Sequence, residues 1–528
     1  MDESPKSAKQ HTQNKVPQSK RHCWECRRRC LVCDSELPEC KRCRASGIQC
    51  PGYGEVKPTR LKWVTPGRVL SRDQKQKKSL VYKNQYSHTD ITTGSTSIIA
   101  PMKHDIYMPI PRFEMHEEAR AILQGYEYCN ILANTCRIVN SCIYTDLIPL
   151  HELGYNPYVY PLSEKHLQAA VWCPDYLKYG MLCMIVSHRI NQIGSAIPPR
   201  AMVEKFYLYW GLAVRSLNEY LDKEDRRSGD SVIAGILTLL LADIQQGSSL
   251  NWRCHLDAIY RLIMLRGGFY AVAESKSMEP LLLCFWSVAV MGNTTCPASN
   301  LFMTTLQVDT LKFLPQQYIT TVSPIQLCPV ALFIEIIRIN HLRMRVTRPD
   351  AAATKAFQKE SFEILDRINC FSPHRLAQSK SSNQEVWALV GLVYQAAVSI
   401  YCILSLQSLS ILPETPAIRV QCATHGRLMQ TLLVEALASK SLKRFMIWPL
   451  VVLGVEAVHG DAPMRAFVAK ELSELSQSVG SFVPLTAKRV LGEFWASGKT
   501  RWDACFDRPY VFTGQIAVDT SGLMPLYK

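Results

Sequence analysis

The chain lacks the short motifs with which many enzymes hold phosphates, metals or acyl groups. It contains no P-loop, no G-x-G-x-x-G after a predicted strand, no H-E-x-x-H and no G-x-S-x-G. Cys254, His255 and Asp257 stand together, but neighbours on a helix point in different directions, so a surface or capping role suits His255 better than catalysis. His459 and Asp461 flank a glycine and indicate a turn. We therefore expect that the protein is not an enzyme.

An apolar segment is also missing from the start of the chain, where residues 1–22 are polar and charged. Secreted proteins with disulfide frameworks begin with such a segment, so the sequence gives no reason to expect disulfides. Thirteen of the 20 cysteines lie beyond residue 50 and form no further C-x2-C pair. Cysteines scattered in this way are typically small buried apolar residues of a protein in a reducing compartment.

Acidic residues are scarce in the first part of the chain. Residues 1–83 contain 20 Lys and Arg against 8 Asp and Glu, a net charge of +12, whereas the whole chain carries +15. Residues 84–528 thus contribute only +3. A concentrated basic segment is typical of a nucleic-acid-binding arm, whose affinity falls steeply with salt. A membrane-binding arm would need an amphipathic helix with aromatic anchors, and residues 1–22 show none.

The basic segment contains six cysteines in which one spacing occurs twice. The pattern C-x2-C-x6-C is followed after six residues by its own repeat, and its members are Cys23, Cys26, Cys33, Cys40, Cys43 and Cys50. Thiols at C-x2-C spacing can both reach one tetrahedral zinc ion, because the intervening turn directs the two side chains to a common point. Two such halves predict a site for two zinc ions within residues 21–52.

Two zinc ions offer eight ligand positions, but the segment supplies six thiols and no suitably spaced histidine. The simplest arrangement has two thiolates that each bridge both metals, and the symmetry of the repeat favours the first cysteine of each half, Cys23 and Cys40. One zinc ion would then be bound by this pair with Cys26 and Cys33. The other would be bound by the same pair with Cys43 and Cys50.

Residues 22–54 resemble the DNA-binding domain of the fungal binuclear zinc cluster transcription factors. Besides the cysteines, the resemblance rests on the basic run Arg27–Arg29, on Asp34 after the third cysteine and on Pro38 two residues before the fourth. It implies a small domain in which each half is a short helix followed by an extended strand around the metal cluster. It also implies that the first helix enters the major groove of duplex DNA and usually reads a CGG triplet.

Basic residues directly follow the metal-binding cysteines. Two zinc ions with six thiolates form a core of net negative charge, which needs cations nearby. Cations beyond this need can pair with phosphates or with guanine O6 and N7, which arginine meets with two hydrogen bonds. The candidate DNA-contacting residues are Arg27, Arg28, Arg29, Lys41, Arg42 and Arg44.

The sequence departs from the family pattern at Cys30 and Val32, where members usually carry basic residues. In the family, the residues that correspond to Arg29 and Cys30 make the principal base contacts, and one such contact is worth about 1–3 kcal/mol of discrimination. Cys30 could be an alternative zinc ligand or a redox-sensitive thiol, although a tolerated substitution is the simpler interpretation. This departure leaves a second hypothesis open, a zinc-binding scaffold protein that no longer reads DNA sequence.

A linker and a large helical domain account for the remaining chain. Residues 1–20 are expected to be a disordered basic arm, and residues 53–115 a linker that is first basic and then polar. No sustained heptad pattern follows the cysteines, so the chain is predicted either to bind DNA as a monomer or to dimerise through its C-terminal region. The helical domain is assigned to residues 116–505 and a tail to residues 506–528.

Helical patterns follow one another from about residue 116, and alternating strand patterns are almost absent. Asp230 is a candidate N-cap, and Gly267 with Gly268 a candidate stop. A region of roughly 400 residues with many apolar faces can bury a large core, which predicts an all-α domain. The helices are expected at 116–137, 202–223, 231–246, 254–266, 277–292, 331–344, 354–369, 384–407, 417–439 and 463–479.

This region resembles the fungal-specific transcription factor domain, most visibly in the segment WRCHLDAIYRLIMLRGGF at 252–269. Among the members of that family it is most similar to factors such as the acriflavine sensitivity control protein. The resemblance implies a regulatory role without catalysis, which in some members of the family is exerted through a ligand or a partner. Residues 386–406 carry no charge and are long enough to cross a membrane, but Gln395, Ser399 and the lack of a second such segment favour a core helix.

These patterns together predict a nuclear transcription factor that binds CGG-type sites in genes of RNA polymerase II. Its cofactor would be zinc, with two ions per chain, and its partners would be double-stranded DNA and the transcription machinery or co-regulators, with no membrane. The residues do not choose between activation and repression. They also do not choose among metabolic genes, drug-resistance genes and a secondary-metabolite gene cluster.

Overall fold

A computed structural model describes the chain as two compact units, Met1–Ile110 and Pro111–Lys528. In the first unit the described residues are 23, 25–26, 33–36, 39–46 and 50. In the second they run from 136 to 514, with 518 and 523, except for 155–158, 164, 167–171, 194–198, 224–227, 248–250, 313–326, 348–353 and 461. The expected arm at 1–20, the linker at 53–115 and most of the expected helix at 116–137 lie outside the described residues.

The second unit is built from helices, and no strand occurs among its described residues. It begins with the short turns η1 (Val139–Tyr144), α5 (Thr145–Leu147) and η2 (Ile148–Leu153). The helices that follow are α7 (Asp175–Ile193), α8 (Arg200–Leu221), α9 (Asp230–Gln245), α10 (Trp252–Leu265), α11 (Phe269–Ala273), α12 (Glu279–Thr294), α13 (Thr304–Asp309), α15 (Val330–Val346), α16 (Thr354–Asn369), α17 (Pro373–Gln378), α18 (Gln384–Ser408), α19 (Pro416–Ala438), α20 (Ile447–Glu456), α21 (Ala462–Val479), α22 (Val483–Ala496) and α23 (Trp502–Cys505). The prediction of a large all-α domain is confirmed.

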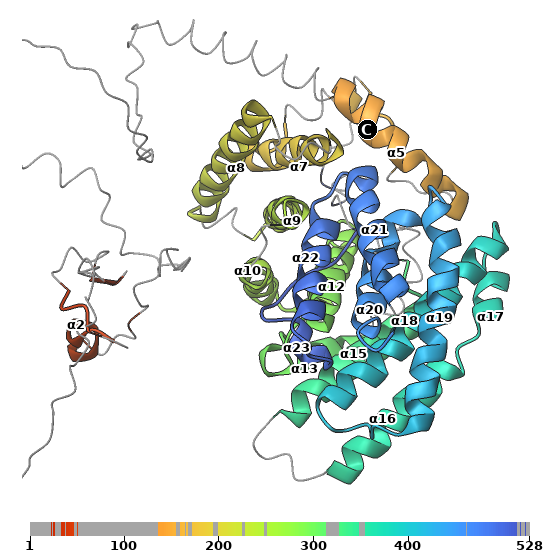
Figure 1. Cartoon of the computed structure of the whole chain (residues 1–528). Helices are drawn as coiled ribbons and strands as arrows, with labels where there is room; N and C mark the ends of the chain where they lie inside the picture. The colour runs from red at the N-terminus through yellow and green to blue at the C-terminus, as the bar shows by residue number, and fades with distance from the viewer. Residues whose placement is uncertain are drawn as a thin grey trace, which may run out of the picture. The chain divides into compact units, whose positions relative to one another are not determined.

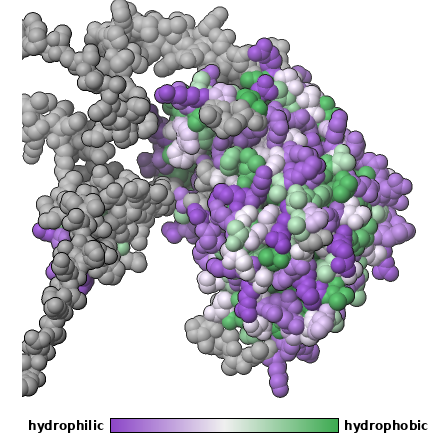
Figure 2. All heavy atoms as spheres, viewed as in Figure 1, coloured by the Kyte–Doolittle hydropathy of each residue, from purple (hydrophilic) through white to green (hydrophobic). Residues whose placement is uncertain are grey.

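The helices are arranged around a central group of apolar ones. Figure 1 shows α7 to α10 on one side of this unit and α16, α17 and α19 on the other, with α12, α15, α18 and α20 between them. Every residue of α20 is buried, and so is every residue of α12 after its first. On the face that Figure 2 displays, apolar side chains lie dispersed among hydrophilic ones, because the continuous apolar surface is inside.

The long apolar helix α18 is the centre of the core. Among the described residues it is the one helix long and apolar enough to cross a membrane, and 89% of its most apolar window is buried inside the unit. It contacts α15, α16, α17, α19, α20 and α23. Its Gln395 side chain donates hydrogen bonds of 2.9 Å to the carbonyls of Ile368 and Phe371, which satisfies the amide. The prediction of a core helix is confirmed.

A charged residue crosses the core next to α18. Arg343 in α15 has no exposed side-chain surface, and it donates hydrogen bonds to Tyr401 Oη at 2.9 Å and to Asp503 Oδ1 at 2.6 Å. It also donates to the carbonyls of Asn293 at 3.2 Å and Cys296 at 2.8 Å. These contacts join α15, α18 and α23 to the end of α12. We call Arg343, Tyr401 and Asp503, with the two carbonyls, the Arg343 cluster.

The predicted helix stop and the predicted helix N-cap had different outcomes. Gly267 and Gly268 follow the end of α10 and both have positive φ, at 92° and 91°, so they stop the helix as predicted. The prediction that Asp230 is an N-cap is wrong, because the N-cap of α9 is Gly229 and Asp230 is the first helical residue. Its carboxylate instead pairs with Arg266 at 2.6 Å. This ion pair holds the start of α9 to the end of α10.

Three helices of ten or more residues were not anticipated, and the core continues past its expected end. These three helices are α7, α20 and α22, and the shorter α5, α11, α13, α17 and α23 were not anticipated either. The core includes Phe506 and Phe512, which have 1% and 2% of their surface exposed. The packed part of the chain therefore extends into the segment that we assigned to a tail from residue 506.

Candidate metal centre

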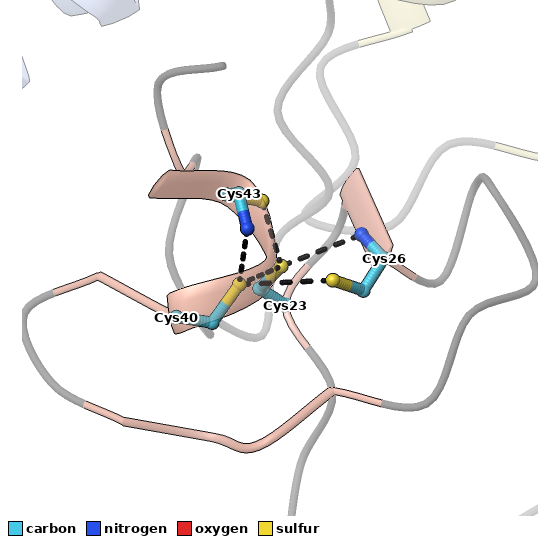
Figure 3. Close-up of side chains that lie close together, drawn as sticks. All are labelled: Cys23, Cys26, Cys40 and Cys43. Carbon is cyan, nitrogen blue, oxygen red and sulfur yellow. Dashed lines mark hydrogen bonds between the residues drawn. The ribbon is translucent and has the colours of Figure 1, made fainter. Parts of the chain in front are cut away.

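Four thiols of the first unit converge on one point (Figure 3). The sulfur of Cys23 lies 3.7 Å from those of Cys40 and Cys43, and the sulfur of Cys26 lies 3.6 Å from that of Cys40. All four residues are buried, with 2% or less of their surface exposed. None of them takes part in a disulfide. The fold thus brings together the two C-x2-C pairs, which are 17 residues apart in the chain.

The spacing of these sulfurs fits a tetrahedral metal site. A zinc ion with sulfur ligands at about 2.3 Å requires neighbouring sulfurs about 3.8 Å apart. The observed separations of 3.6 and 3.7 Å agree with this requirement. The four sulfurs also lie within 4.8 Å of one another, so that one ion could reach all of them. These four residues could hold a metal ion, whereas the ligand sets predicted from the sequence assign Cys26 and Cys43 to different ions.

The two halves of the repeat share one local geometry. In the first half the backbone N–H of Cys26 donates to the sulfur of Cys23 at 3.4 Å, and in the second half that of Cys43 donates to the sulfur of Cys40 at 3.3 Å. Each C-x2-C turn therefore directs an N–H group at the first sulfur of its pair. Such a hydrogen bond stabilises a negatively charged sulfur. At the first cysteine of each half this hydrogen bond favours the thiolate form that a metal ion requires.

The third cysteine of each half lies close to the same group. The sulfur of Cys33 accepts a hydrogen bond of 3.5 Å from the backbone N–H of Cys23, and Cys33, Asp34 and Cys40 form a second group of potential ligands. Cys50 is half-buried and packs against the buried cysteines. All six cysteines of the repeat therefore belong to one cluster.

The protonation of the thiols links metal binding to pH. Burial raises the pKa of the Cys23 and Cys26 thiols above the usual value and raises that of Cys43 to about 12. At Cys33 burial also opposes ionisation, but hydrogen bonds from the backbone N–H groups of Cys23 and Ser35 outweigh it and lower the pKa to about 7. A metal ion therefore has to displace protons from most of these thiols, and its affinity falls as the pH falls.

The second half of the repeat contains the short helix α2 (Lys41–Ala45), which separates ligand from basic side chains. Cys43 is buried against the other thiols, whereas Lys41, Arg42 and Arg44 are exposed. Glu36 lies near two of these cations, 3.3 Å from Lys41 Nζ and 3.7 Å from Arg44. No ion pair involves Arg42 among the described residues. Arg42 is therefore the cation of α2 that is most available to an external anion.

Asp34 has a structural role that the sequence analysis did not assign. Its carboxylate accepts a hydrogen bond of 3.0 Å from the backbone N–H of Lys41, the first residue of α2. This hydrogen bond lowers the pKa of Asp34 below its usual value. The contact ties the segment after Cys33 to the start of α2, and a carboxylate at a helix start is favourable. The signal in the sequence was an acidic residue seven positions before a helix that begins with a basic one.

The first half of the repeat is described only in part. Glu25 and Cys26 are helical, in agreement with a short helix after Cys23. The candidate DNA contacts Arg27, Arg28 and Arg29, and the atypical residues Cys30 and Val32, lie outside the described residues. The strand expected after each helix is not seen among the described residues of either half.

Comparison with known proteins places the helical unit. Residues 176–509, more than half of the chain, match the family described as "Fungal specific transcription factor domain". The chain is also 45% identical over 505 residues to the "Phomenoic acid biosynthesis cluster-specific transcriptional regulator" of Leptosphaeria maculans, which covers 95% of this chain and 91% of that protein. No solved structure matches the chain. On this evidence the chain belongs to the fungal-specific transcription factors and is a regulator of transcription rather than an enzyme.

Proposed function

We propose that the chain is a sequence-specific DNA-binding regulator that reads CGG-type sites through a cluster of two zinc ions. Cys23, Cys26, Cys33, Cys40, Cys43 and Cys50 hold the two ions, with Cys23 and Cys40 shared between them. The observation that carries the proposal is the spacing of 3.6–3.7 Å between sulfurs of both halves. This spacing matches a tetrahedral zinc site, and the cysteine repeat supplies enough thiols for a second ion.

The basic side chains around the cluster would contact the DNA. Lys41, Arg42 and Arg44 project from α2 away from the buried thiols, so they are accessible to a phosphate or a base edge. Together with Arg27–Arg29 they would supply more positive charge than a cluster of two zinc ions and six thiolates, itself net negative, requires. The metal ions would supply the rigidity of the unit, since two short half-repeats without a large core need such a link to stay folded. The chain's own residues would supply the recognition.

The genes that this regulator controls would form a biosynthetic gene cluster. The support is the printed name of the 45% identical protein, a regulator specific to one biosynthesis cluster, and the fact that the likeness covers nearly the whole of both chains. The protein would act in the nucleus on genes of RNA polymerase II, as binding to duplex DNA in a fungal cell requires. Transcription of a neighbouring biosynthetic cluster in a deletion strain tests this part of the proposal.

The DNA-binding proposal is tested by selecting random duplex DNA with the full-length zinc-loaded protein at two salt concentrations. Enrichment of a CGG-containing sequence supports the proposal. Binding that depends on salt but enriches no sequence would instead support the second hypothesis, a zinc-binding regulator that acts through its helical unit.

A matched pair of variants locates the binding surface. Arg42→Ala removes an exposed cation of α2, and Arg427→Ala removes an exposed cation of α19. Affinity falls as salt rises, so the slope of log affinity against log salt is negative. If Arg42 contacts a phosphate, Arg42→Ala makes this slope less steep by about 0.9, and Arg427→Ala leaves it unchanged. Equal slopes for Arg42→Ala and the unmodified protein would exclude Arg42 from the interface.

A further inference from the structure

A cavity of about 350 Å³ opens where three connections of the helical unit meet. Its walls come from the last turn of α18, the first turn of α19, the turn after α20 and the segment before α23. Leu404 and Pro416 contribute apolar surface, while Gln407, Thr415 and Thr500 contribute polar groups. A volume of this size falls within the range of sites that take small organic molecules, about 300–1,000 Å³.

Two arginines contribute their side chains to this cavity. Arg419 and Arg501 both line it, and Glu414 is the one carboxylate among its lining residues. His459 also lines the cavity, and burial and the nearby charge of Arg419 lower its pKa, so its ring is neutral near pH 7. The start of α19, a helix of 23 residues, adds the positive end of a helix dipole to the same wall.

The two arginines are held differently. Arg419 pairs with Glu456, a carboxylate that is almost fully buried behind the cavity wall and that also accepts a hydrogen bond from the Cys422 thiol at 3.2 Å. This pairing fixes the guanidinium at the wall and leaves it with further N–H donors. Arg501 is exposed, and among the described residues no ion pair or side-chain hydrogen bond involves it. The cavity thus has one anchored cation and one cation that is free to close on a ligand.

The cavity also adjoins the interior of the unit. Ser408 lines it, and the Ser408 hydroxyl accepts a hydrogen bond of 3.2 Å from the backbone N–H of Asp503. The carboxylate of Asp503 belongs to the Arg343 cluster. A molecule in the cavity would therefore lie two contacts away from the Arg343 cluster. Because it would bind only the folded unit, its binding should stabilise the unit against unfolding.

We propose that this cavity is a binding site for a small organic carboxylate. The carboxylate lies between Arg501 and Arg419, where it accepts charge-assisted hydrogen bonds, and the apolar part of the molecule lies against Leu404 and Pro416. An inorganic anion would leave most of the cavity unfilled and the apolar wall without a partner. The proposal concerns a site in the helical unit, so it stands independently of how the zinc unit reads DNA.

The site is tested with 2-naphthoate and its uncharged analogue 2-naphthamide, using ligand-observed NMR titrations of the full-length zinc-loaded protein. The two probes have nearly the same shape, so their difference isolates the charge. The carboxylate should bind about tenfold more tightly than the amide, because hydrogen bonds between ionised groups are roughly twice as strong as neutral ones. Inorganic phosphate serves as a competitor.

Three variants make the test specific. Arg501→Gln should weaken 2-naphthoate binding at least fivefold, while Lys499→Gln, which removes the same charge two residues away outside the lining, should leave it unchanged. Thr500→Trp places a large side chain at the cavity wall from an exposed position and should reduce binding of both probes. Unchanged thermal melting of each variant shows that its fold is intact.

Four outcomes would overturn the proposal. They are the absence of 2-naphthoate binding at millimolar concentration, equal affinity for the acid and the amide, equal effects of Arg501→Gln and Lys499→Gln, and displacement of 2-naphthoate by phosphate at a lower concentration than that of the probe. DNA binding by the same preparation is measured in parallel. A site that fails this test while DNA binding persists leaves the proposed function untouched.

Discussion

Removal of the Asp503 carboxylate should destabilise the helical unit more than removal of its partner, Arg343. Arg343 is completely buried, whereas 22% of the Asp503 side chain is exposed. In Asp503→Ala the guanidinium stays in the core with only Tyr401 and two carbonyl oxygens as partners. In Arg343→Met the charge left behind can reach water, and methionine fills much of the vacated volume.

The magnitudes follow from the burial of each group. Leaving an uncompensated charge in a core costs about 3–5 kcal/mol, and the partial exposure of this pair places Asp503→Ala near 3 kcal/mol. Arg343→Met should cost about 1–3 kcal/mol, chiefly from the carbonyls of Asn293 and Cys296 that lose their donor. The double variant has no buried charge, so its cost should be about 2 kcal/mol less than the sum of the single ones.

The assay is urea unfolding followed by far-UV circular dichroism and by tryptophan fluorescence. The second signal is informative because Trp502 packs on Tyr401, with ring centroids 5.0 Å apart. Asp503→Asn serves as the control, since its amide oxygen can still accept from Arg343 while the negative charge is gone. An Asp503→Ala variant within 0.5 kcal/mol of the unmodified protein, or strict additivity in the double variant, would refute the reasoning.

Three further predictions concern other parts of the chain. Acidification should release the metal, because protons compete for thiols such as Cys43, whose pKa is raised to about 12. Zinc release measured from pH 7.5 to 5 with a chromogenic chelator should be reversible. Retention of zinc that does not depend on pH would contradict the thiolate site. Cys30→Lys should raise affinity for CGG-containing DNA by about 1–3 kcal/mol if position 30 faces a base, and an unchanged titration would show that it does not. Gly480→Ala should cost about 2–4 kcal/mol, because φ is +64° and a Cβ would lie 2.4 Å from the His188 ring; Gly498→Ala, at φ +68° in open space, should cost only about 1 kcal/mol, and equal thermal melting of the two variants would refute this.

The sequence predicted the bounds of several helices closely and missed others. The expected helix 354–369 has the observed bounds of α16, and 384–407 differs from α18 by one residue. The missed helix α20, IWPLVVLGVE, is buried on every side, so no polar face marks a helical period, and its third residue is proline. The missed α7 contains Gly180, whose lack of a side chain allows contact with Thr238 of α9, and His188, which is buried. Tertiary contacts, which a local pattern does not contain, determine both.

The sequence predicted the thiols of the candidate site but not the roles of the acidic residues beside them. The spacing of the cysteines was enough to group the six thiols, because C-x2-C turns have one common geometry, and the structure brings them together. The roles of Asp34 and Glu36 were not predicted, since each depends on how the chain between Cys33 and Cys40 folds back onto α2. The base contacts of Arg27–Arg29 stay a prediction.

The central place of α18 has a consequence for how the protein is made. Three of the helices that cover it, α19, α20 and α23, are synthesised after it. At about 5–20 residues per second, the ribosome needs roughly 5–20 s to deliver them. During this interval the nascent chain displays a helix whose residues 386–406 carry no charge and whose later partners are not yet in place to bury it. A message cut short between α18 and α23 would therefore yield an aggregating product rather than a shortened regulator.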